Sequence, residues 1–561
     1  MKENLAELVT DAISQAKKVG EISFSYDVKP FFEHPKDKTH GDWATNVAMV
    51  LASQANLSPR KVADFIVKHL NDKQHFLSKV EIAGPGFINF YLSDKWFRGV
   101  LKEIKEKSEK FGYFDMGYGK KVLIEFVSAN PVGPLHVGHG RWAAVGDALA
   151  NLMTAAGYNV AREFYINDYG NQMRIFGDSV AARYVEFLGE EVAFPEDGYR
   201  GEYIKEIAQE IVEKEGDKHF ALSSSERSKI FRKIAYRQVL AHIKKVLLTM
   251  GVKFDVWFSE TPLHDSGAID EAISELRKQG YVYKENGALW LRTTDFEDDK
   301  DRVLVRENGK PTYFAADIAY HKNKLNRDFD KLIDIWGADH HGYVKRVEAA
   351  IQALGYPKEK LEIIIGQLVN LWRGGELVRM SKRTGEMVTL EELLQEVGSD
   401  AARYFFLMRS TNTALDFDIE LAKSQSSDNP VYYVQYAHAR ICNILKFAEE
   451  KSFSLPNIED VNFNLLCEES ELDLMRKLME FEEVIEVSVR KLIPFRLTKY
   501  AEELASLFHV FYTKCRVIND DSACQQADVE LSKARLILVD CVRQVLNNVL
   551  NLMGISAPKK M

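Results

Sequence analysis

The fold is indicated most clearly by the segment Ser128-Ala-Asn-Pro-Val-Gly-Pro-Leu-His-Val-Gly-His-Gly140. It follows a short apolar run, residues 121–127, that predicts a β-strand. Residues 160–165 predict a second strand. Between them, apolar side chains recur at helical spacing, at Ala144, Val145, Ala148, Leu149, Leu152 and Met153. A strand, a glycine loop, a helix and a strand form a βαβ unit, so we expect an α/β, Rossmann-like, doubly wound parallel sheet.

His136-Val137-Gly138-His139 begins the predicted helix of this unit. Unpaired N–H groups and a partial positive charge at a helix N-terminus suit a phosphate, and glycine lets the backbone approach a nucleotide closely. His136 and His139 are three residues apart, so both imidazoles can donate hydrogen bonds to phosphate oxygens. Two alternatives stay open for this tetrapeptide alone, namely two satisfied loop histidines or, with no acid or cysteine nearby to complete a ligand set, a metal site.

Composition bounds the chain without deciding its function. Its 561 residues are enough for three or four domains, and 46% apolar residues allow several cores. The formal net charge of −9 argues weakly against nucleic-acid binding, yet an acidic enzyme can carry a local basic channel.

The composition and the hydrophobic pattern of the sequence change along the chain. Residues 1–118 predict a small α+β domain, with a helix opened by Ser58 and Pro59 and a hairpin at residues 80–92 around Gly84-Pro-Gly86. Residues 119–390 predict the α/β domain, with a charged helical insertion at about 178–253. Residues 391–561 predict an all-α bundle that is helical without interruption to about residue 553.

Cysteine spacing and hydropathy predict the compartment. None of the five cysteines forms a CxxC pair, so we expect no zinc site and no disulfide framework. The N-terminus reads as an amphipathic helix without a signal peptide, and no apolar run reaches about 18 residues. We therefore expect no membrane segment and a cytoplasmic location.

A second motif, Val378-Arg-Met-Ser-Lys-Arg-Thr-Gly385, follows the α/β region. Met380, Ser381 and Lys382, with Arg383 as a further candidate, could clamp a polyphosphate leaving group. Read alone, the segment is equally compatible with a solvated basic loop.

The two motifs together resemble class I aminoacyl-tRNA synthetases, which hold ATP between them. Four further stretches narrow the resemblance to the arginyl-tRNA synthetases. They are Glu125-Phe-Val-Ser-Ala-Asn-Pro131, Trp336-Gly-Ala-Asp-His-His-Gly342, Asn429-Pro-Val-Tyr-Tyr-Val-Gln-Tyr-Ala-His-Ala-Arg440 and the N-terminal His40-Gly-Asp-Trp-Ala-Thr-Asn46. The resemblance spans essentially the whole chain. One departure is that Arg379, and no lysine, precedes Met380.

The resemblance implies L-arginine, ATP and tRNA(Arg) as substrates and Mg²⁺ carried by the phosphates, with no dedicated metal site and no zinc. His136, His139 and Lys382 would be catalytic, and His136, Gly138, His139, Gly337, Asp339, Met380, Ser381 and Lys382 would bind ATP. Glu125, Ser128, Asn130, His139, Tyr313, Asp317 and His341 would bind arginine. Tyr313 and Asp317 are four residues apart, so one helical face can present a phenol and a carboxylate.

The same resemblance implies that the N-terminal domain contacts the tRNA elbow and that the C-terminal bundle reads the anticodon. Candidate contacts are Phe87, Asn89, Tyr432, Tyr436, Phe511 and Tyr512, although each aromatic could instead be a core residue. A monomer is expected. Two rival functions are a small nucleotidylyltransferase, which predicts a compact chain without long helical appendages, and a catalytically silent tRNA-binding paralogue, which predicts broken motifs.

Overall fold

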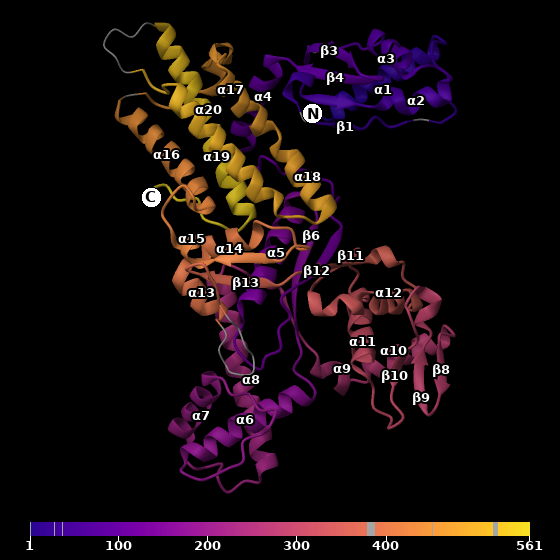
Figure 1. Cartoon of the computed structure of the whole chain (residues 1–561), viewed down its shortest axis with the longest axis vertical. Helices are drawn as coiled ribbons and strands as arrows, with labels where there is room; N and C mark the ends of the chain where they lie inside the picture. The colour runs from indigo at the N-terminus through magenta and orange to yellow at the C-terminus, as the bar shows by residue number, and fades with distance from the viewer. Residues whose placement is uncertain are drawn as a thin grey trace. The chain divides into compact units, whose positions relative to one another are not determined.

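In the computed structural model the chain forms two compact units, each built from separate stretches of sequence. The first unit contains residues 1–108, 444–480 and 507–542, and the second contains residues 109–443, 481–506 and 543–561. The structure describes residues 2–26, 28–35, 37–73, 75–378, 388–451, 453–519 and 526–561 (Figure 1). The domain boundaries expected after residues 118 and 390 stay predictions.

The first unit contains a four-stranded antiparallel sheet in the order β1-β2-β4-β3. The expected hairpin at residues 80–92 is confirmed as β3 and β4, joined by a turn in which Gly84 and Gly86 take positive φ angles of 52° and 136°. Ser58 caps α3 as expected, since its side chain accepts a hydrogen bond from the N–H of Lys61. The elements are α1 (Lys2–Lys18), β1 (Phe32–Glu33), β2 (Trp43–Thr45), α2 (Val47–Ala55), α3 (Pro59–Lys68), β3 (Leu77–Ala83), β4 (Phe87–Leu92), α4 (Asp94–Lys107) and α17 (Glu469–Met479).

The second unit is built around a five-stranded, all-parallel sheet in the order β12-β11-β5-β6-β7. The expected doubly wound α/β sheet is therefore confirmed. In chain order β5 is the first strand of this sheet. Strands β6 and β7 follow on one side of β5, and β11 and β12 follow on its other side. The strand order thus reverses between β5 and β11, and ligands of such sheets bind outside the carboxyl ends of the strands at this point. The strands are β5 (Lys121–Glu125), β6 (Asn159–Ile166), β7 (Val256–Ser259), β11 (Lys331–Gly337) and β12 (Leu361–Gly366).

Helices connect these strands and add two insertions. Between β6 and β7 the chain forms three helices that occupy the stretch expected to be a helical insertion (Figure 1). Between β7 and β11 it forms helices and a small antiparallel sheet, β10-β9-β8, which pack around α11. The elements are α5 (Val137–Ala155), α6 (Asn171–Phe187), α7 (Glu202–Glu215), α8 (Ser224–Thr249), α9 (Thr261–Asp265), α10 (Ala268–Lys278), β8 (Val282–Glu285), β9 (Ala288–Leu291), β10 (Arg302–Val305), α11 (Tyr313–Leu325) and α12 (Val344–Ala353).

The expectation of uninterrupted helix after residue 391 is wrong, since residues 415–418 form a strand and residues 453–457 are not helical. Residues Leu415–Asp418 form β15, which pairs in parallel with β13. Leu415 and Phe417 are buried, and Asp416 and Asp418, which alternate with them, are more exposed, so the four residues carry the two-residue period of a strand. The other elements here are β13 (Val369–Arg373), β14 (Glu376–Leu377), α13 (Leu390–Val397), α14 (Ser399–Leu407), α15 (Ile419–Lys423), α16 (Pro430–Glu450), α18 (Phe481–Lys491), α19 (Arg496–Lys514) and α20 (Gln526–Leu552).

Two fully buried arginines fix α5 in the second unit. Arg141 donates to the carbonyl oxygens of Gln367, Ser410 and Thr413, each at 2.9 Å. Arg403 of α14 pairs with Asp147 of α5 at 2.6 Å and also donates to the carbonyls of Met250 and Met553. Burial without a carboxylate partner lowers the pKa of Arg141 to about 10. The helix that begins with the histidine motif is therefore held along its length by buried polar contacts.

Candidate active site

The histidine motif lies at the N-terminus of α5, as the sequence predicts. His136 is the N-cap residue, and its backbone N–H donates to Nδ1 of His139 at 3.2 Å. The two imidazole rings stack with their centroids 3.6 Å apart. A Cβ atom on Gly138 would lie 3.0 Å from Cε1 of His136, so the glycine makes room for this arrangement. The stacked rings and the first-turn N–H groups together form a surface suited to phosphate.

The turn that joins β5 to this motif is strained. Val127 and Ser128 have φ angles of 71° and 42°, in the left-handed region that a β-branched residue rarely adopts. Such strain persists only where surrounding contacts fix the backbone. Oγ of Ser128 donates to Oε1 of Glu125 at 2.8 Å and accepts the N–H of Tyr165 at 3.2 Å. The side-chain amide of Asn130 donates to Gln172 at 2.8 Å.

Tyr313 and Asp317 lie one turn apart at the start of α11, as expected. Thr312 caps the helix, and the Tyr313 side chain is 61% exposed. Asp317 is partly buried, and Oδ2 accepts a hydrogen bond from the hydroxyl of Tyr343 at 2.6 Å. Burial raises the pKa of Asp317 to about 6, aided by the charges of Glu260 and Glu125 and opposed by Tyr343 and His321. A cation beside this carboxylate would be strongly favoured.

Glu260 is a candidate that the sequence reading missed. It follows the carboxyl end of β7, is 2% exposed, and contacts Nε2 of His264 at 2.9 Å through Oε1. The charge of Glu260 helps to raise the pKa of Asp317. Burial raises the pKa of Tyr165, and the charges of Glu260 and Asp317 add to that shift. No lysine or arginine of the described ranges forms an ion pair with Glu260 or Asp317. We call these two residues the acceptor pair. Recognition of residues 256–259 as a strand would have revealed Glu260, because ligand-binding groups follow such strands.

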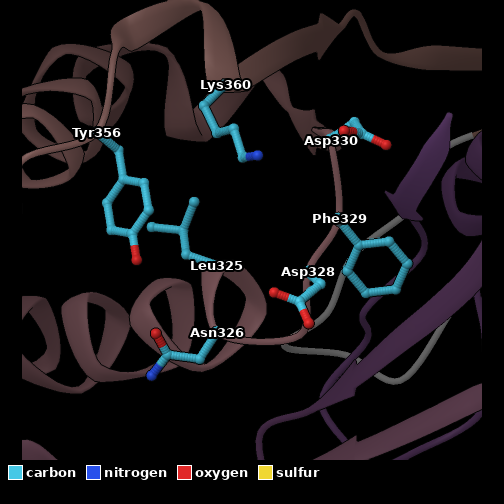
Figure 2. A pocket seen from close by; sticks show the side chains of 7 residues that line it. All are labelled: Leu325, Asn326, Asp328, Phe329, Asp330, Tyr356 and Lys360. Atoms are coloured by element: carbon cyan, nitrogen blue, oxygen red, sulfur yellow. The ribbon is translucent and has the colours of Figure 1, made fainter.

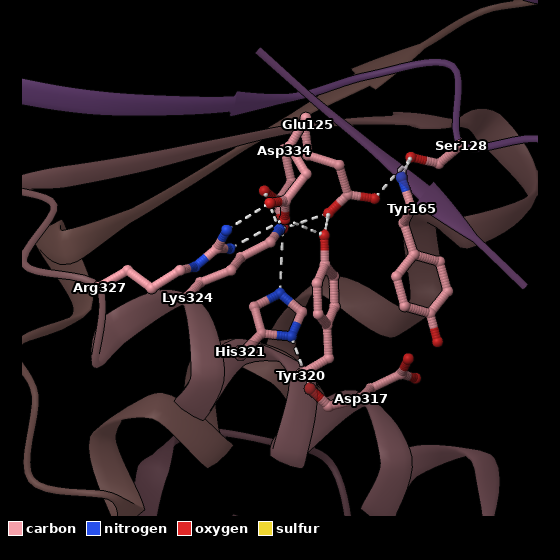
Figure 3. A network of polar contacts seen from close by, with 10 residues as sticks. Glu125, Ser128, Tyr165, Asp317, Tyr320, His321, Lys324, Arg327 and Asp334 are labelled. Atoms are coloured by element: carbon pink, nitrogen blue, oxygen red, sulfur yellow. Dashed lines mark hydrogen bonds and ion pairs between the residues drawn. The ribbon is translucent and has the colours of Figure 1, made fainter. Parts of the chain in front are cut away.

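Glu125 lies at the end of β5 but is engaged by the protein itself. It is 5% exposed, and besides Ser128 it accepts the hydroxyl of Tyr320 at 3.0 Å and the ammonium group of Lys324 (Figure 3). Figure 3 also shows Glu125 beside Asp334, with His321, Lys324 and Arg327 around them. The sequence reading missed these partners because they are brought together only by strand pairing and by α11.

The segment after β11 lies on the other side of the point where the strand order reverses between β5 and β11. Gly337 ends β11, and residues 338–343 form a 3-10 helix in which Asp339 and His341 are exposed. Because β11 and β5 are parallel neighbours, Asp339 and His341 follow the same edge of the sheet as Glu125. Their roles toward ATP and arginine stay predictions.

Met380, Ser381, Lys382 and Arg383 lie outside the described residues. The chain that resumes after them is anchored at the histidine motif, since Thr389 forms an isolated antiparallel bridge with His136 and the N–H of Leu390 donates to the carbonyl of Leu135 at 2.7 Å. Leu390 also lies under Gly140, where an added Cβ would be 2.5 Å from Cδ1 of that leucine.

The candidate tRNA contacts divide by exposure. Tyr436 is 39% exposed and stacks against Tyr432 with a centroid distance of 6.1 Å, and Tyr512 is 36% exposed. Phe87 is partly buried at the hairpin. Phe511 is fully buried and Asn89 is 4% exposed, so neither side chain is available to a base. These two expectations are corrected, because α19 turns Phe511 into the core and β4 turns Asn89 inward.

A cavity of about 530 Å³ lies in the same unit but at the opposite edge of the sheet (Figure 2). It is lined by residues at the end of α11 and before β11, with side chains from beyond α12. These are Leu325, Asn326, Asp328, Phe329, Asp330, Tyr356 and Lys360. It lies at the amino end of β11, so it is separate from the acceptor pair. Among the described residues, no cluster of histidine, cysteine and acidic side chains is arranged to hold a metal, and no helix is long and apolar enough to span a membrane.

Comparisons with known proteins match every part of the chain. Residues 3–92 match the model of the arginyl tRNA synthetase N terminal domain, residues 102–430 that of the class I (R) tRNA synthetase catalytic domain, and residues 434–561 that of the DALR anticodon binding domain. The arginine–tRNA ligase of Moorella thermoacetica is 51% identical over 100% of this chain and 99% of its own. That of Bacillus pumilus is 49% identical over 100% of both chains.

Solved structures agree with these sequence matches. A Campylobacter jejuni structure described as an arginyl-tRNA synthetase has a TM-score of 0.76 and 33% identity, and the match covers 84% of this chain and 100% of that one. The Thermus thermophilus arginyl-tRNA synthetase, at 21% identity, shares the fold over 100% of both chains with a TM-score of 0.76. The chain therefore belongs to the arginyl-tRNA synthetases, the class I ligases that attach arginine to tRNA(Arg).

Proposed function

We propose that this site converts L-arginine and ATP into arginyl-adenylate and pyrophosphate, and then transfers arginine to the 3′ end of tRNA(Arg) with release of AMP. The observation that carries the proposal is the placement of the acceptor pair. Asp317 and Glu260 have no lysine or arginine partner among the described residues, and they lie at the same carboxyl edge of the sheet as the phosphate-binding start of α5.

The first step needs positioning and charge stabilisation more than acid–base catalysis. The arginine carboxylate is ionised at neutral pH, so it can attack the α-phosphorus directly while the bond to the β-phosphate oxygen breaks. His136 and His139, stacked at the helix N-terminus, donate hydrogen bonds to the α-phosphate oxygens as charge builds there. Gly138 allows the phosphates to approach the backbone.

Other groups hold the rest of ATP. Met380, Ser381 and Lys382 bind the β- and γ-phosphates in this proposal, supported by the anchoring of Thr389 against His136. Gly337 and Asp339, at the end of β11, bind the nucleoside. Mg²⁺ bound to the phosphates would neutralise charge on the leaving pyrophosphate, with oxygen ligands mostly from phosphate and water.

The guanidinium of arginine binds at the acceptor pair. Its planar fork of N–H donors fits a carboxylate in bidentate geometry, and Asp317 is the more accessible of the two carboxylates. The exposed Tyr313 lies one helical turn away and adds a phenol to the same face. Ser128, Asn130, His139 and His341 would hold the backbone end of arginine near the phosphate, and their individual contacts stay predictions.

In the second step the terminal ribose 2′-hydroxyl of tRNA attacks the carbonyl carbon of the adenylate, and AMP leaves with its phosphate. Tyr432, Tyr436 and Tyr512 offer partly exposed rings on which unstacked anticodon bases can lie. Phe87 serves the N-terminal contact with the tRNA elbow. We also propose that tRNA must be bound for the first step. The cytoplasmic location and the monomeric state remain predictions.

ATP–pyrophosphate exchange with each of the twenty amino acids, with and without tRNA, tests the proposal. We expect exchange with arginine alone, and only when tRNA is present. Exchange with another amino acid would overturn the substrate assignment, and arginine exchange without tRNA would overturn the tRNA requirement.

Lys382 gives a separate prediction about the leaving group. We expect Lys382→Ala to lower the single-turnover rate of adenylate formation by roughly 100-fold or more, because a cation that stabilises transition-state charge is lost. Lys360→Ala, in the cavity at the opposite sheet edge, is the matched control and should leave the rate unchanged. A near-wild-type rate for Lys382→Ala would refute the role.

A further inference from the structure

Three carboxylates lie side by side across the middle of the parallel sheet. In the strand register Glu125 of β5 is opposite Glu163 of β6 on one side and Asp334 of β11 on the other. All three are at most 5% exposed. Three negative charges so close together and so deeply buried require positive partners.

A lysine, an arginine and a histidine from α11 and the residues just after it surround these carboxylates. Lys324 is 0% exposed, and its ammonium group bonds both Glu125 and, at 2.7 Å, Asp334. Arg327 forms a bidentate pair with Glu163, at 2.6 and 3.0 Å. We call the three carboxylates together with Lys324, Arg327 and His321 the buried charge cluster (Figure 3).

His321 is the third of these groups, and both of its ring nitrogens face oxygen atoms. Nδ1 lies 2.8 Å from the carbonyl oxygen of Asp317, and Nε2 lies 3.0 Å from Oδ2 of Asp334. His321 therefore contacts the same carboxylate of Asp334 that Lys324 bonds.

Both carboxylate oxygens of Glu125 accept hydrogen bonds from groups of the protein. Oε1 accepts from Ser128, and Oε2 accepts from Tyr320 and Lys324. The bond to Ser128 holds the strained turn, with its positive φ angles, that leads into the histidine motif. The position of Glu125 therefore links the ammonium group of Lys324 to the backbone on which Ser128 and Asn130 lie.

We propose that Lys324 is a positioning residue for the arginine substrate, acting through Glu125. Its ammonium group occupies the deep cation position between Glu125 and Asp334. The substrate guanidinium is thereby confined to the acceptor pair, and the Ser128 turn is held for the backbone end of arginine. Glu125, expected from resemblance to bind arginine, instead serves it indirectly. This inference rests on the proposed function, because it explains why the guanidinium of arginine binds at the acceptor pair and not at Glu125.

A purely fold-stabilising role for Lys324 is a different reading with a different outcome. A buried ion pair contributes little net stability, because desolvation of both charges offsets their attraction. A positioning role changes the KM for arginine while leaving the KM for ATP nearly unaltered, whereas general destabilisation changes both or neither.

The test compares Lys324→Met with Lys322→Met in tRNA-dependent ATP–pyrophosphate exchange. Lys322 lies on the same helix and also pairs with a carboxylate, that of Glu275, but outside the buried charge cluster. For Lys324→Met we expect the KM for arginine to rise about 10- to 100-fold and the KM for ATP to change less than about threefold. Lys322→Met should match the wild type. Equal KM values for arginine in the two variants would overturn the proposal.

Two further variants keep the proposal testable if Lys324→Met does not fold. Lys324→Arg keeps the charge and should bring the KM for arginine to within about threefold of the wild type. Lys324→Met combined with Asp334→Asn restores the charge balance without the bond to Glu125, and its KM for arginine should stay raised. A wild-type KM in the double variant, or an unrescued Lys324→Arg, would overturn the proposal. If the wild-type enzyme itself shows no arginine-dependent exchange, the proposed function fails instead.

Discussion

The acceptor pair and the three carboxylates of the buried charge cluster have opposite surroundings. Glu125, Glu163 and Asp334 are each bonded to a lysine or an arginine, and Lys324 and His321 lower the pKa of Asp334 in spite of its burial. Asp317 and Glu260 lack such partners among the described residues, and the pKa of Asp317 is raised. Burial of a carboxylate alone therefore does not mark a ligand site. A carboxylate left without a protein cation does so.

Removing the charge of Asp317 should give the largest effect. We expect Asp317→Asn to lower kcat/KM for arginine by about 1,000-fold, because a site built around a charge-assisted bidentate contact loses most of its selectivity when that contact is lost. Steady-state aminoacylation and ATP–pyrophosphate exchange measure it.

The control for this variant lies at the other edge of the sheet. Asp328 is exposed, lines the cavity of Figure 2 and has a φ angle of 57°, which asparagine tolerates well. Asp328→Asn should leave kcat/KM unchanged. A loss below about tenfold in Asp317→Asn would show that Asp317 is not a main acceptor.

Acid should weaken arginine binding before it affects ATP. In the free enzyme the pKa of Asp317 is about 6, set by burial and by Glu260, Glu125, Tyr343 and His321 around it. Arginine binds the ionised form, so its KM should rise about tenfold for each pH unit below 6 and stay level above it. The measurement is the KM for arginine from pH 5 to 8. Asp317→Asn should abolish the inflection, and an unchanged profile in that variant would assign it to another group.

The free energy of unfolding should fall as pH rises, whereas arginine binding should strengthen, and the change in stability should be the smaller of the two effects. Folding raises the pKa of Asp317 above its ordinary value of 3.8, so the group favours the fold at low pH and this contribution is lost as pH rises through about 6. After discount for its partial exposure, the ionised group costs the free enzyme about 1–2 kcal/mol at pH 8. Asp317→Asn should therefore raise the thermal midpoint at pH 8 and raise it by a smaller amount at pH 5, because the loss develops between pH 3.8 and about 6. A lower thermal midpoint for Asp317→Asn than for the wild type at pH 8 would contradict an ionised Asp317 that no protein cation neutralises.

The sequence predicted the sheet and the histidine motif because both rest on local pattern. The alternation around Gly84-Pro-Gly86 corresponds to β3 and β4, and the apolar runs predicted at residues 121–127 and 160–165 correspond to β5 and β6. It missed β7 and β15, because each strand has only four residues, too few for a pattern to stand out in the sequence. Missing β7 also concealed Glu260.

The site was predictable only where residues are close in sequence. Tyr313 and Asp317, or His136 and His139, are related by a helical turn, so spacing alone brings them together. Lys324 and Asp334 meet Glu125 through strand pairing over about 200 residues of chain, which no local pattern encodes. The burial of Asn89 and Phe511 was likewise a tertiary outcome.

The number of protons released when arginine binds tests whether Asp317 is the carboxylate that accepts the guanidinium. Titration calorimetry of the tRNA-bound enzyme with arginine, in two buffers of different ionisation enthalpy, counts the protons. We predict release of between about one-half and one proton at pH 5.5 and close to none at pH 8, with none at either pH in Asp317→Asn. Arginine binding at pH 5.5 without proton release, or with the same release in Asp317→Asn, would contradict the account.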